Sequence, residues 1–141
     1  MGSFGKDGIQ LILLSKYITM IITKDKNLKQ LQEEFCEIFP GLKIEFYKNA
    51  ELGYEGPYNM LHYDLDTTIS QFNSDLTSQK MEIDEEVTVA EFEEKLSEIL
   101  GINAQVFRRS KELWLQTTST DKWTLARQNL KGLHSMQAEK V

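Results

Sequence analysis

The side chains that most often do chemistry in proteins are scarce in this sequence. It contains two histidines, His62 and His134, and one cysteine, Cys36, and no two of them stand at the spacing of metal-ligand pairs. His62 and Asp64 are near neighbours in an expected loop, an arrangement that is common by chance. The sequence therefore predicts no metal site and no cofactor.

Catalytic and nucleotide-binding motifs are also missing. There is no G-x-S-x-G turn to present a nucleophilic serine, and no G-x-x-x-x-G-K-[ST] or G-x-G-x-x-G loop to hold phosphates. Cys36 is surrounded by acidic residues, whereas a reactive thiol needs an electropositive setting. We therefore predict no catalytic residues and lean against an enzyme.

Charge argues against nucleic acid as a partner. The formal net charge is −6, and the segment from Glu82 to Glu98 holds eight acids against one base, Lys95. Phosphate binding needs a basic face, which an acidic chain does not supply in general. A protein partner, either another protein or a second copy in a homodimer, is the better expectation.

The residues that could form a binding surface are aromatic and basic. The stretch "VFRRSKELWLQTTSTDKW" places two arginines and two tryptophans close together, and "GYEGPYNMLHY" adds a turn-rich aromatic loop. Aromatic and arginine side chains are enriched at protein interfaces. The predicted contact residues are Tyr54, Tyr58, Tyr63, Arg108, Arg109, Trp114 and Trp123.

Two segments that could position these residues share one pattern. "MIITKDKNLKQLQEEFCEIFPGLKIEFYK" begins at Met20 and "MEIDEEVTVAEFEEKLSEILGINAQVFRR" begins at Met81. Apolar residues recur in both at steps of 3, 4, 3 and 1, the spacing of one helix face. Asn27 and Thr88 begin capping boxes, and alternating residues follow each helix. The pattern predicts an internal repeat of strand, helix and strand.

Two such units predict an α+β domain with a ferredoxin-like sheet, antiparallel or mixed, and both helices on one face. Residues 65–76 predict a short third helix, and 113–117 a fifth strand after a turn through Arg109–Ser110. A C-terminal helix capped by Thr120 or Asp121 would lay its apolar stripe over three outward-facing aromatics of the sheet, Tyr47, Phe107 and Trp114. The stripe consists of Trp123, Ala126, Leu130 and Leu133. If the helix does not cover them, the aromatics would form a face for a partner or a second copy, or a platform for nucleic acid or a small ligand. A β-grasp, ubiquitin-like arrangement is the alternative.

The repeat also sets the expected domain bounds. Residues 20–134 form one domain, residues 1–19 a leader or extra strand, and residues 135–141 a tail. The longest unbroken apolar run in the opening segment, Leu11 to Leu14, is too short to cross a membrane, and no cleavage pattern follows it. We expect a cytoplasmic protein without a membrane partner.

The stretches "VFRRSKELWLQTTSTDKWTLARQN", "TVAEFEEKLSEILGI" and "MIITKDKNLKQLQEEFCEIFPGLKIEFY" resemble a group of small uncharacterised bacterial proteins. The likeness spans about residues 20 to 132. That group has no assigned activity, so the resemblance implies no catalytic residues.

The function expected from the sequence is a non-catalytic binding or regulatory module that contacts proteins. The alternative is a ligand-binding or enzymatic domain with a pocket near the loop of residues 53–66, which would use His62 and Asp64 as polar groups.

Overall fold

The computed structural model describes residues 17–48 and 62–138, and these form an α+β fold. In chain order the elements are β1 (Tyr17–Ile22), α2 (Leu28–Ile38), β2 (Leu42–Tyr47), α3 (Ile69–Phe72), β3 (Gln79–Asp84), α4 (Val89–Leu100), β4 (Asn103–Ser110), β5 (Leu113–Gln116), the 3-10 helix η2 (Thr118–Thr120) and α5 (Leu125–Ala138). The two predicted strand–helix–strand segments and the short third helix are all present. β1 begins at Tyr17, three residues before the expected start of the domain.

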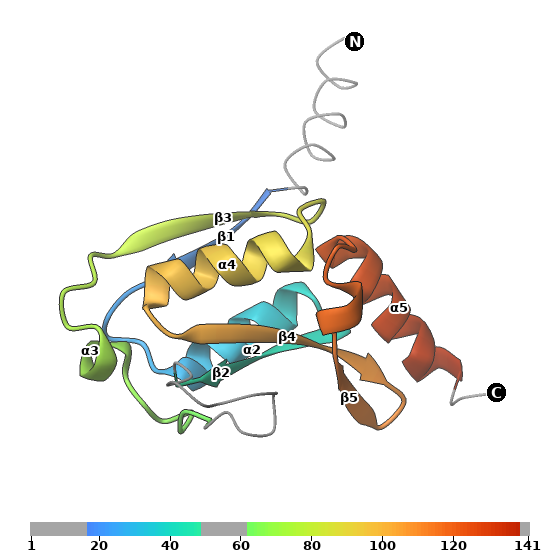
Figure 1. The fold of residues 1–141 in the computed structure, drawn as a ribbon, viewed down its shortest axis with the longest axis horizontal. Coiled ribbons are helices and arrows are strands. Elements are labelled where there is room, and N and C mark those ends of the chain that lie inside the picture. The colour runs from blue at the N-terminus through green and yellow to red at the C-terminus, as the bar shows by residue number, and fades with distance from the viewer. Residues whose placement is uncertain (1–16, 49–61, 139–141) are drawn as a thin grey trace, which may run out of the picture.

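The strands divide between two antiparallel sheets, which differs from the single ferredoxin-like sheet expected. β1 pairs with β3, and a second sheet has the order β2-β4-β5. Helices α2 and α4 lie between these sheets (Figure 1). Each strand of one predicted unit therefore pairs with its counterpart in the other unit, so the units are joined along both sheets.

The predicted helix stripes form the centre of the core. Leu31 and Phe35 of α2, and Phe92 and Leu96 of α4, are buried, and the Phe35 and Phe92 rings stack with centroids 5.1 Å apart. The inner faces of both sheets join this core through Met20, Ile22, Leu42, Ile44, Phe46, Met81, Ile83, Ala104 and Val106. Burial of these side chains supplies the main favourable free energy of folding.

The capping boxes form as the sequence predicts. Asn27 Oδ1 accepts from the Gln30 amide at 2.9 Å, and Thr88 Oγ1 accepts from the Glu91 amide at 3.1 Å. The helix ends differ, because Gly101 closes α4 in the left-handed conformation, with φ of 80°, whereas Phe39 closes α2. Each box satisfies backbone donors that a helix start otherwise leaves free.

The helix starts also dock against one another in pairs. The first two amides of α4, Val89 and Ala90, donate to the carbonyls of Trp123 and Asp121, and Leu125 and Ala126 of α5 donate to Val87 and Glu85 in return, at 2.9–3.0 Å. The starts of α2 and α3 are joined by four equivalent hydrogen bonds. The amides of Leu28 and Lys29 donate to the carbonyls of Thr67 and Leu65. The amides of Ile69 and Ser70 donate in return to the carbonyls of Lys26 and Lys24. This reciprocal docking fixes where α5 leaves the turn that contains Trp123.

α5 does not cover the aromatic face of the sheet, contrary to the sequence-based expectation. Its buried residues are Leu125, Gln128 and Gly132, whereas Leu130, which the apolar pattern predicts to be buried, is 54% exposed. It crosses the sheet where β2 begins, and a Cβ on Gly132 would lie 2.4 Å from the Gly41 carbonyl oxygen. The helix therefore continues through Gly132, and both glycines are required by close backbone contact.

Two local boundaries also differ from the expected ones. β4 extends to Ser110, so the turn to β5 falls at residues 111–112, and Lys111 takes a positive φ of 57° there. α5 begins after Thr124, whose Oγ1 accepts from the Arg127 amide at 3.1 Å, while Thr120 belongs to η2. Hydroxyl residues are so frequent in this stretch that several could have served as the cap.

Candidate functional site

The β4–β5 hairpin carries different side chains on its two sides. Arg109 pairs with Trp114, and Arg108 pairs with Leu115. Side chains of directly paired residues share a side of the sheet, and neighbours along a strand point to opposite sides. The two adjacent arginines and the two tryptophans therefore belong to separate surfaces.

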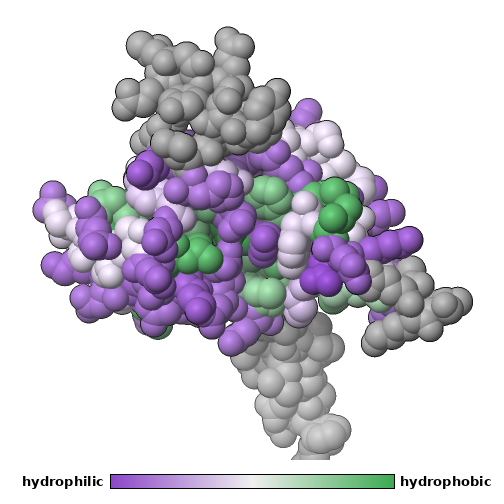
Figure 2. Space-filling model, turned by 90° about the horizontal axis from the view of Figure 1, so that it is seen from below, coloured by the Kyte–Doolittle hydropathy of each residue, from purple (hydrophilic) through white to green (hydrophobic). Residues whose placement is uncertain are grey.

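The outer side of the sheet holds Trp114. The ammonium of Lys43 lies 5.0 Å from the Trp114 ring centroid, and the Arg109 guanidinium carbon lies 5.4 Å from it. Lys43 also pairs with Glu45 at 3.5 Å. In the view from below the three-stranded sheet, hydrophobic patches are separated by hydrophilic side chains (Figure 2). The predicted outward position of Trp114 is confirmed, but its ring is already engaged by cations.

The opposite side of the hairpin holds Trp123. The guanidinium of Arg127 lies 3.8 Å from its ring centroid and that of Arg108 lies 5.8 Å from it. Arg108 Nη1 donates to Gln128 Oε1 at 2.9 Å, and Gln128 Nε2 donates to the carbonyl and the hydroxyl of Thr120 at 2.8 Å. A fully buried glutamine therefore fixes Arg108 beside the indole.

Exposed leucines extend this side along β5. Leu113 is 66% exposed and Leu115 is 39% exposed, although they alternate in a strand as core residues do. They share their side with Arg108, the cross-strand partner of Leu115. We name the surface formed by Arg108, Leu113, Leu115, Trp123 and Arg127 the hairpin surface.

The remaining predicted contact residues do not join it. Tyr54 and Tyr58 lie outside the described residues. Tyr63 donates its amide to the Phe46 carbonyl at the β2 edge, whereas β5 is at the other edge of the sheet. Its ring packs against Phe72 with centroids 5.2 Å apart. Of the seven predicted residues, the hairpin surface unites Arg108 and Trp123, while Arg109 and Trp114 lie on the reverse side.

His62 and Asp64, the polar groups of the alternative prediction, make local contacts. The exposed His62 ring packs on Tyr47 with centroids 4.4 Å apart, and Asp64 Oδ1 accepts from the Asp66 amide in a turn. Burial, followed by the charge of Glu45, raises the Tyr47 pKa to about 12. Most of the loop expected to form that pocket lies outside the described residues.

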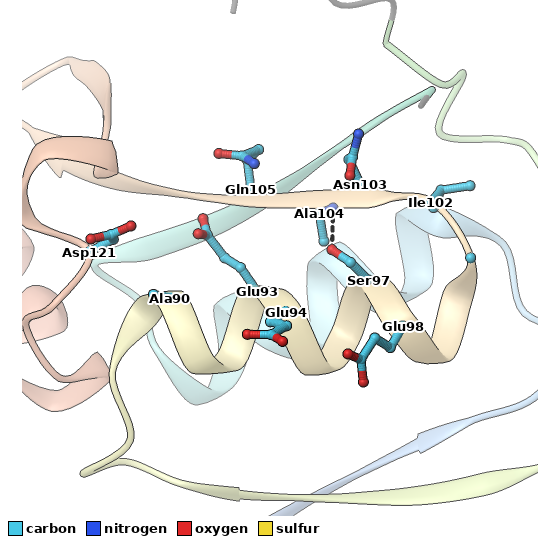
Figure 3. A pocket seen from close by; sticks show the side chains of 11 residues that line it. Ala90, Glu93, Glu94, Ser97, Glu98, Ile102, Asn103, Ala104, Gln105 and Asp121 are labelled. Carbon is cyan, nitrogen blue, oxygen red and sulfur yellow. Dashed lines mark hydrogen bonds between the residues drawn. The ribbon is translucent and has the colours of Figure 1, made fainter. Parts of the chain in front are cut away.

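An acidic groove of about 560 Å³ follows α4 and the first half of β4. β5 pairs with β4 only from Phe107 onward, so the edge before it is free of a strand partner within the described residues. The Val106 amide donates to Glu93 Oε2 at 2.7 Å and the Ala104 amide to Ser97 Oγ at 3.0 Å. Figure 3 shows Glu93 reaching toward β4. These α4 side chains cover the exposed donors of β4.

The Glu93 carboxyl has an altered proton affinity. Burial raises its pKa to about 7, and the charge of Asp121 raises it as well, while the hydrogen bond from Val106 lowers it. Its counterpart five residues after the other N-cap is Gln32, whose Nε2 donates to the Ile44 carbonyl at 2.8 Å. Both side chains cover a sheet edge, although only Glu93 can titrate.

Within residues 17–48 and 62–138, no group of three or more His, Cys, Asp or Glu side chains is placed to hold a metal ion. In the same residues, no helix is both long and apolar enough to cross a bilayer.

Comparison with known proteins adds no identification. No protein-family model, no curated protein and no solved structure matches the chain.

Proposed function

We propose that this protein is a non-catalytic interaction module that binds another protein through the free edge of β5 and the hairpin surface. The observation that carries the proposal is the exposure of Leu113 and Leu115 on a strand that, among the described residues, is paired on one edge only. Two exposed apolar side chains on the same side of a strand with an open edge are characteristic of sites that accept an added strand.

Hydrogen bonds cover the other edges of the three-stranded sheet, which supports β5 as the edge that binds a partner. Gln32 donates to the Ile44 carbonyl and the Tyr63 amide to the Phe46 carbonyl at the β2 edge, and Glu93 and Ser97 cover the first half of β4. Among the described residues, no such hydrogen bond reaches the outer edge of β5. The backbone groups of β5 are therefore the ones left for a partner.

An internal repeat is part of the same proposal. It is supported by the matched capping boxes and by the two reciprocal helix dockings. In the second half, the four-residue strand β5 pairs with β4 and carries the exposed leucines. The proposed contact would then belong to the second copy.

The experiment compares two charge-introducing variants of equal size. Leu115→Lys, the hairpin variant, changes the proposed contact, whereas Ile21→Lys changes an apolar position of comparable exposure on β1, in the other sheet. Each tagged chain is expressed in its native cell, cross-linked, and purified for mass spectrometry. We expect a partner that is recovered with the wild type and the control but lost with the hairpin variant.

Recovery of the same partner by the hairpin variant would refute the proposed surface. Sedimentation of the purified wild type and both variants tests whether the partner is a second copy, because only the hairpin variant should then become monomeric.

A further inference from the structure

We infer that the segment bound by the hairpin surface is acidic, with carboxylates that bind Arg108 and Arg127 and apolar side chains that cover Leu113 and Leu115. The inference rests on the proposed function and adds the chemistry of the partner.

Positive and negative charges are separated along the chain. Residues 105–131 contain six cationic side chains, listed as Arg108, Arg109, Lys111, Lys122, Arg127 and Lys131, and two acids, Glu112 and Asp121, so this segment carries +4. Because the whole chain carries −6, the rest carries −10. A positive region on a negative protein attracts acidic partners selectively.

Among the described residues, no ion pair neutralises these six cations. The ion pairs found among residues 17–48 and 62–138 are Lys26 with Glu34 and Lys43 with Glu45, and neither includes any of the six. Arg108 instead donates a hydrogen bond to the neutral side chain of Gln128. A guanidinium has five N–H donors, so Arg108 retains donors for a carboxylate.

Contacts with neighbouring side chains hold two of these positive charges in place. Arg108 and Arg127 both lie over the Trp123 ring, and the buried Gln128 orients Arg108 further. Holding two like charges at one indole is unfavourable until an anion binds, and a fixed side chain loses little entropy on binding. The arrangement therefore favours a carboxylate more than mobile surface lysines would.

The leucines define the rest of the partner. Leu115 lies beside Arg108 across the strand pair, and Leu113 follows on the same side. A segment that lies along β5 would cover these leucines with apolar residues and turn carboxylates toward Trp123. Nucleic acid lacks both the apolar side chains and the peptide groups that would match an open strand edge, so the surface fits an acidic polypeptide better.

The test selects a displayed library of random twelve-residue peptides against the full-length chain. Enriched peptides are synthesised, and their affinities are measured by fluorescence anisotropy beside single-stranded RNA of mixed sequence. Arg127→Gln with Lys131→Gln removes two exposed charges from α5, and Lys24→Gln with Lys29→Gln removes two exposed charges at the start of α2. Arg108 is left intact, because its loss would leave the buried side-chain oxygen of Gln128 without its donor.

We expect enriched peptides that combine Asp or Glu with apolar residues, with affinity reduced about tenfold by the α5 variant and unchanged by the α2 variant. Raising the salt concentration should weaken this binding. Enriched peptides without acidic residues, equal affinity for the α5 variant, no enrichment, or tighter binding of RNA would each overturn the inference.

A neutral peptide that binds the wild type but not Leu113→Lys with Leu115→Lys would overturn the acidic chemistry while leaving the proposed function intact. An acidic peptide that binds this leucine variant as tightly as the wild type would instead contradict the proposed surface.

Discussion

The guanidinium of Arg108 on β4 donates to the side-chain oxygen of Gln128 on α5 across 2.9 Å. Gln128 has no exposed surface, and its amide nitrogen is bonded to Thr120 in the 3-10 turn. One buried side chain therefore links the strand, the turn and the helix that surround Trp123, so the shape of the hairpin surface depends on it.

Replacing Gln128 should weaken the link between β4, the 3-10 turn and α5, and so lower the stability of the protein. In Gln128→Leu the Thr120 carbonyl and Arg108 both lose a hydrogen-bond partner, and we expect the free energy of unfolding to fall by about 1–3 kcal/mol. Urea denaturation measures the change. Lys131→Gln, at an exposed position three residues later on α5, should shift stability by less than about 0.5 kcal/mol. Equal stability of Gln128→Leu and the wild type would show that the buried link contributes nothing.

Helix propensity alone predicts that alanine at position 132 would stabilise the protein, whereas the close contact between Gly132 and Gly41 predicts that it would destabilise it. Alanine normally stabilises a helix interior relative to glycine by about 1 kcal/mol. In Gly132→Ala the new methyl group would meet the Gly41 carbonyl, 2.4 Å away, and α5 would have to move. We expect a loss of about 1–3 kcal/mol, measured by thermal unfolding, with Lys131→Ala as the exposed control. A more stable Gly132→Ala protein would contradict the close packing of α5.

Glu93 should make stability depend on pH. Its pKa is raised to about 7 from an ordinary value of 4.5, so the folded protein holds the proton more tightly than the unfolded chain does. The associated stability is present at acidic pH and is lost as pH rises from about 4.5 through 7. Glu93→Gln keeps an oxygen for the Val106 amide without the charge.

We therefore expect Glu93→Gln to be more stable than the wild type at pH 8, by about 1–2 kcal/mol after allowance for partial solvent screening, and no more stable at pH 4.5. Chemical denaturation across this range gives the comparison. Glu94→Gln, an exposed neighbour, should follow the wild type at every pH. A constant difference between Glu93→Gln and the wild type would show that Glu93 does not titrate between pH 4.5 and 8.

Local features of this fold could be predicted from sequence because their causes lie within a few residues. The capping residues Asn27 and Thr88 bond to groups three residues ahead, and the buried stripes follow from helix periodicity. The alternation of β4 and β5 likewise assigned Phe107 and Trp114 to one side of the sheet. Pairing between distant strands has no comparable local cause, and the division into two sheets was not predicted.

The buried face of α5 could not be predicted from the sequence, for a different reason. An apolar stripe through Ala126, Leu130 and Leu133 is the ordinary signal for a buried helix face, but the buried face contains Gln128 and Gly132. A buried glutamine is stabilised by hydrogen bonds, and a glycine by close backbone contact, and neither raises hydrophobicity.

The candidate site was predicted in part. Arg108 and Trp123 were singled out by residue type, but type alone could not separate them from Arg109 and Trp114 on the reverse side. The alternation of Leu113 and Leu115 is also typical of inward-facing strand residues, whereas the structure leaves both side chains exposed. The alternation in "ELWLQ" was the available signal, and it fixes which residues share a side without saying which side is covered.

Hydrogen exchange of the full-length protein, alone and with the partner recovered from its native cell, tests the central claim most directly. If the partner adds a strand at the hairpin, amide exchange in β5, residues Leu113–Gln116, should slow in the complex, and the acidic groove along α4 should be unaffected. Slowed exchange confined to the α4 groove or to β1, with β5 unchanged, would contradict the account.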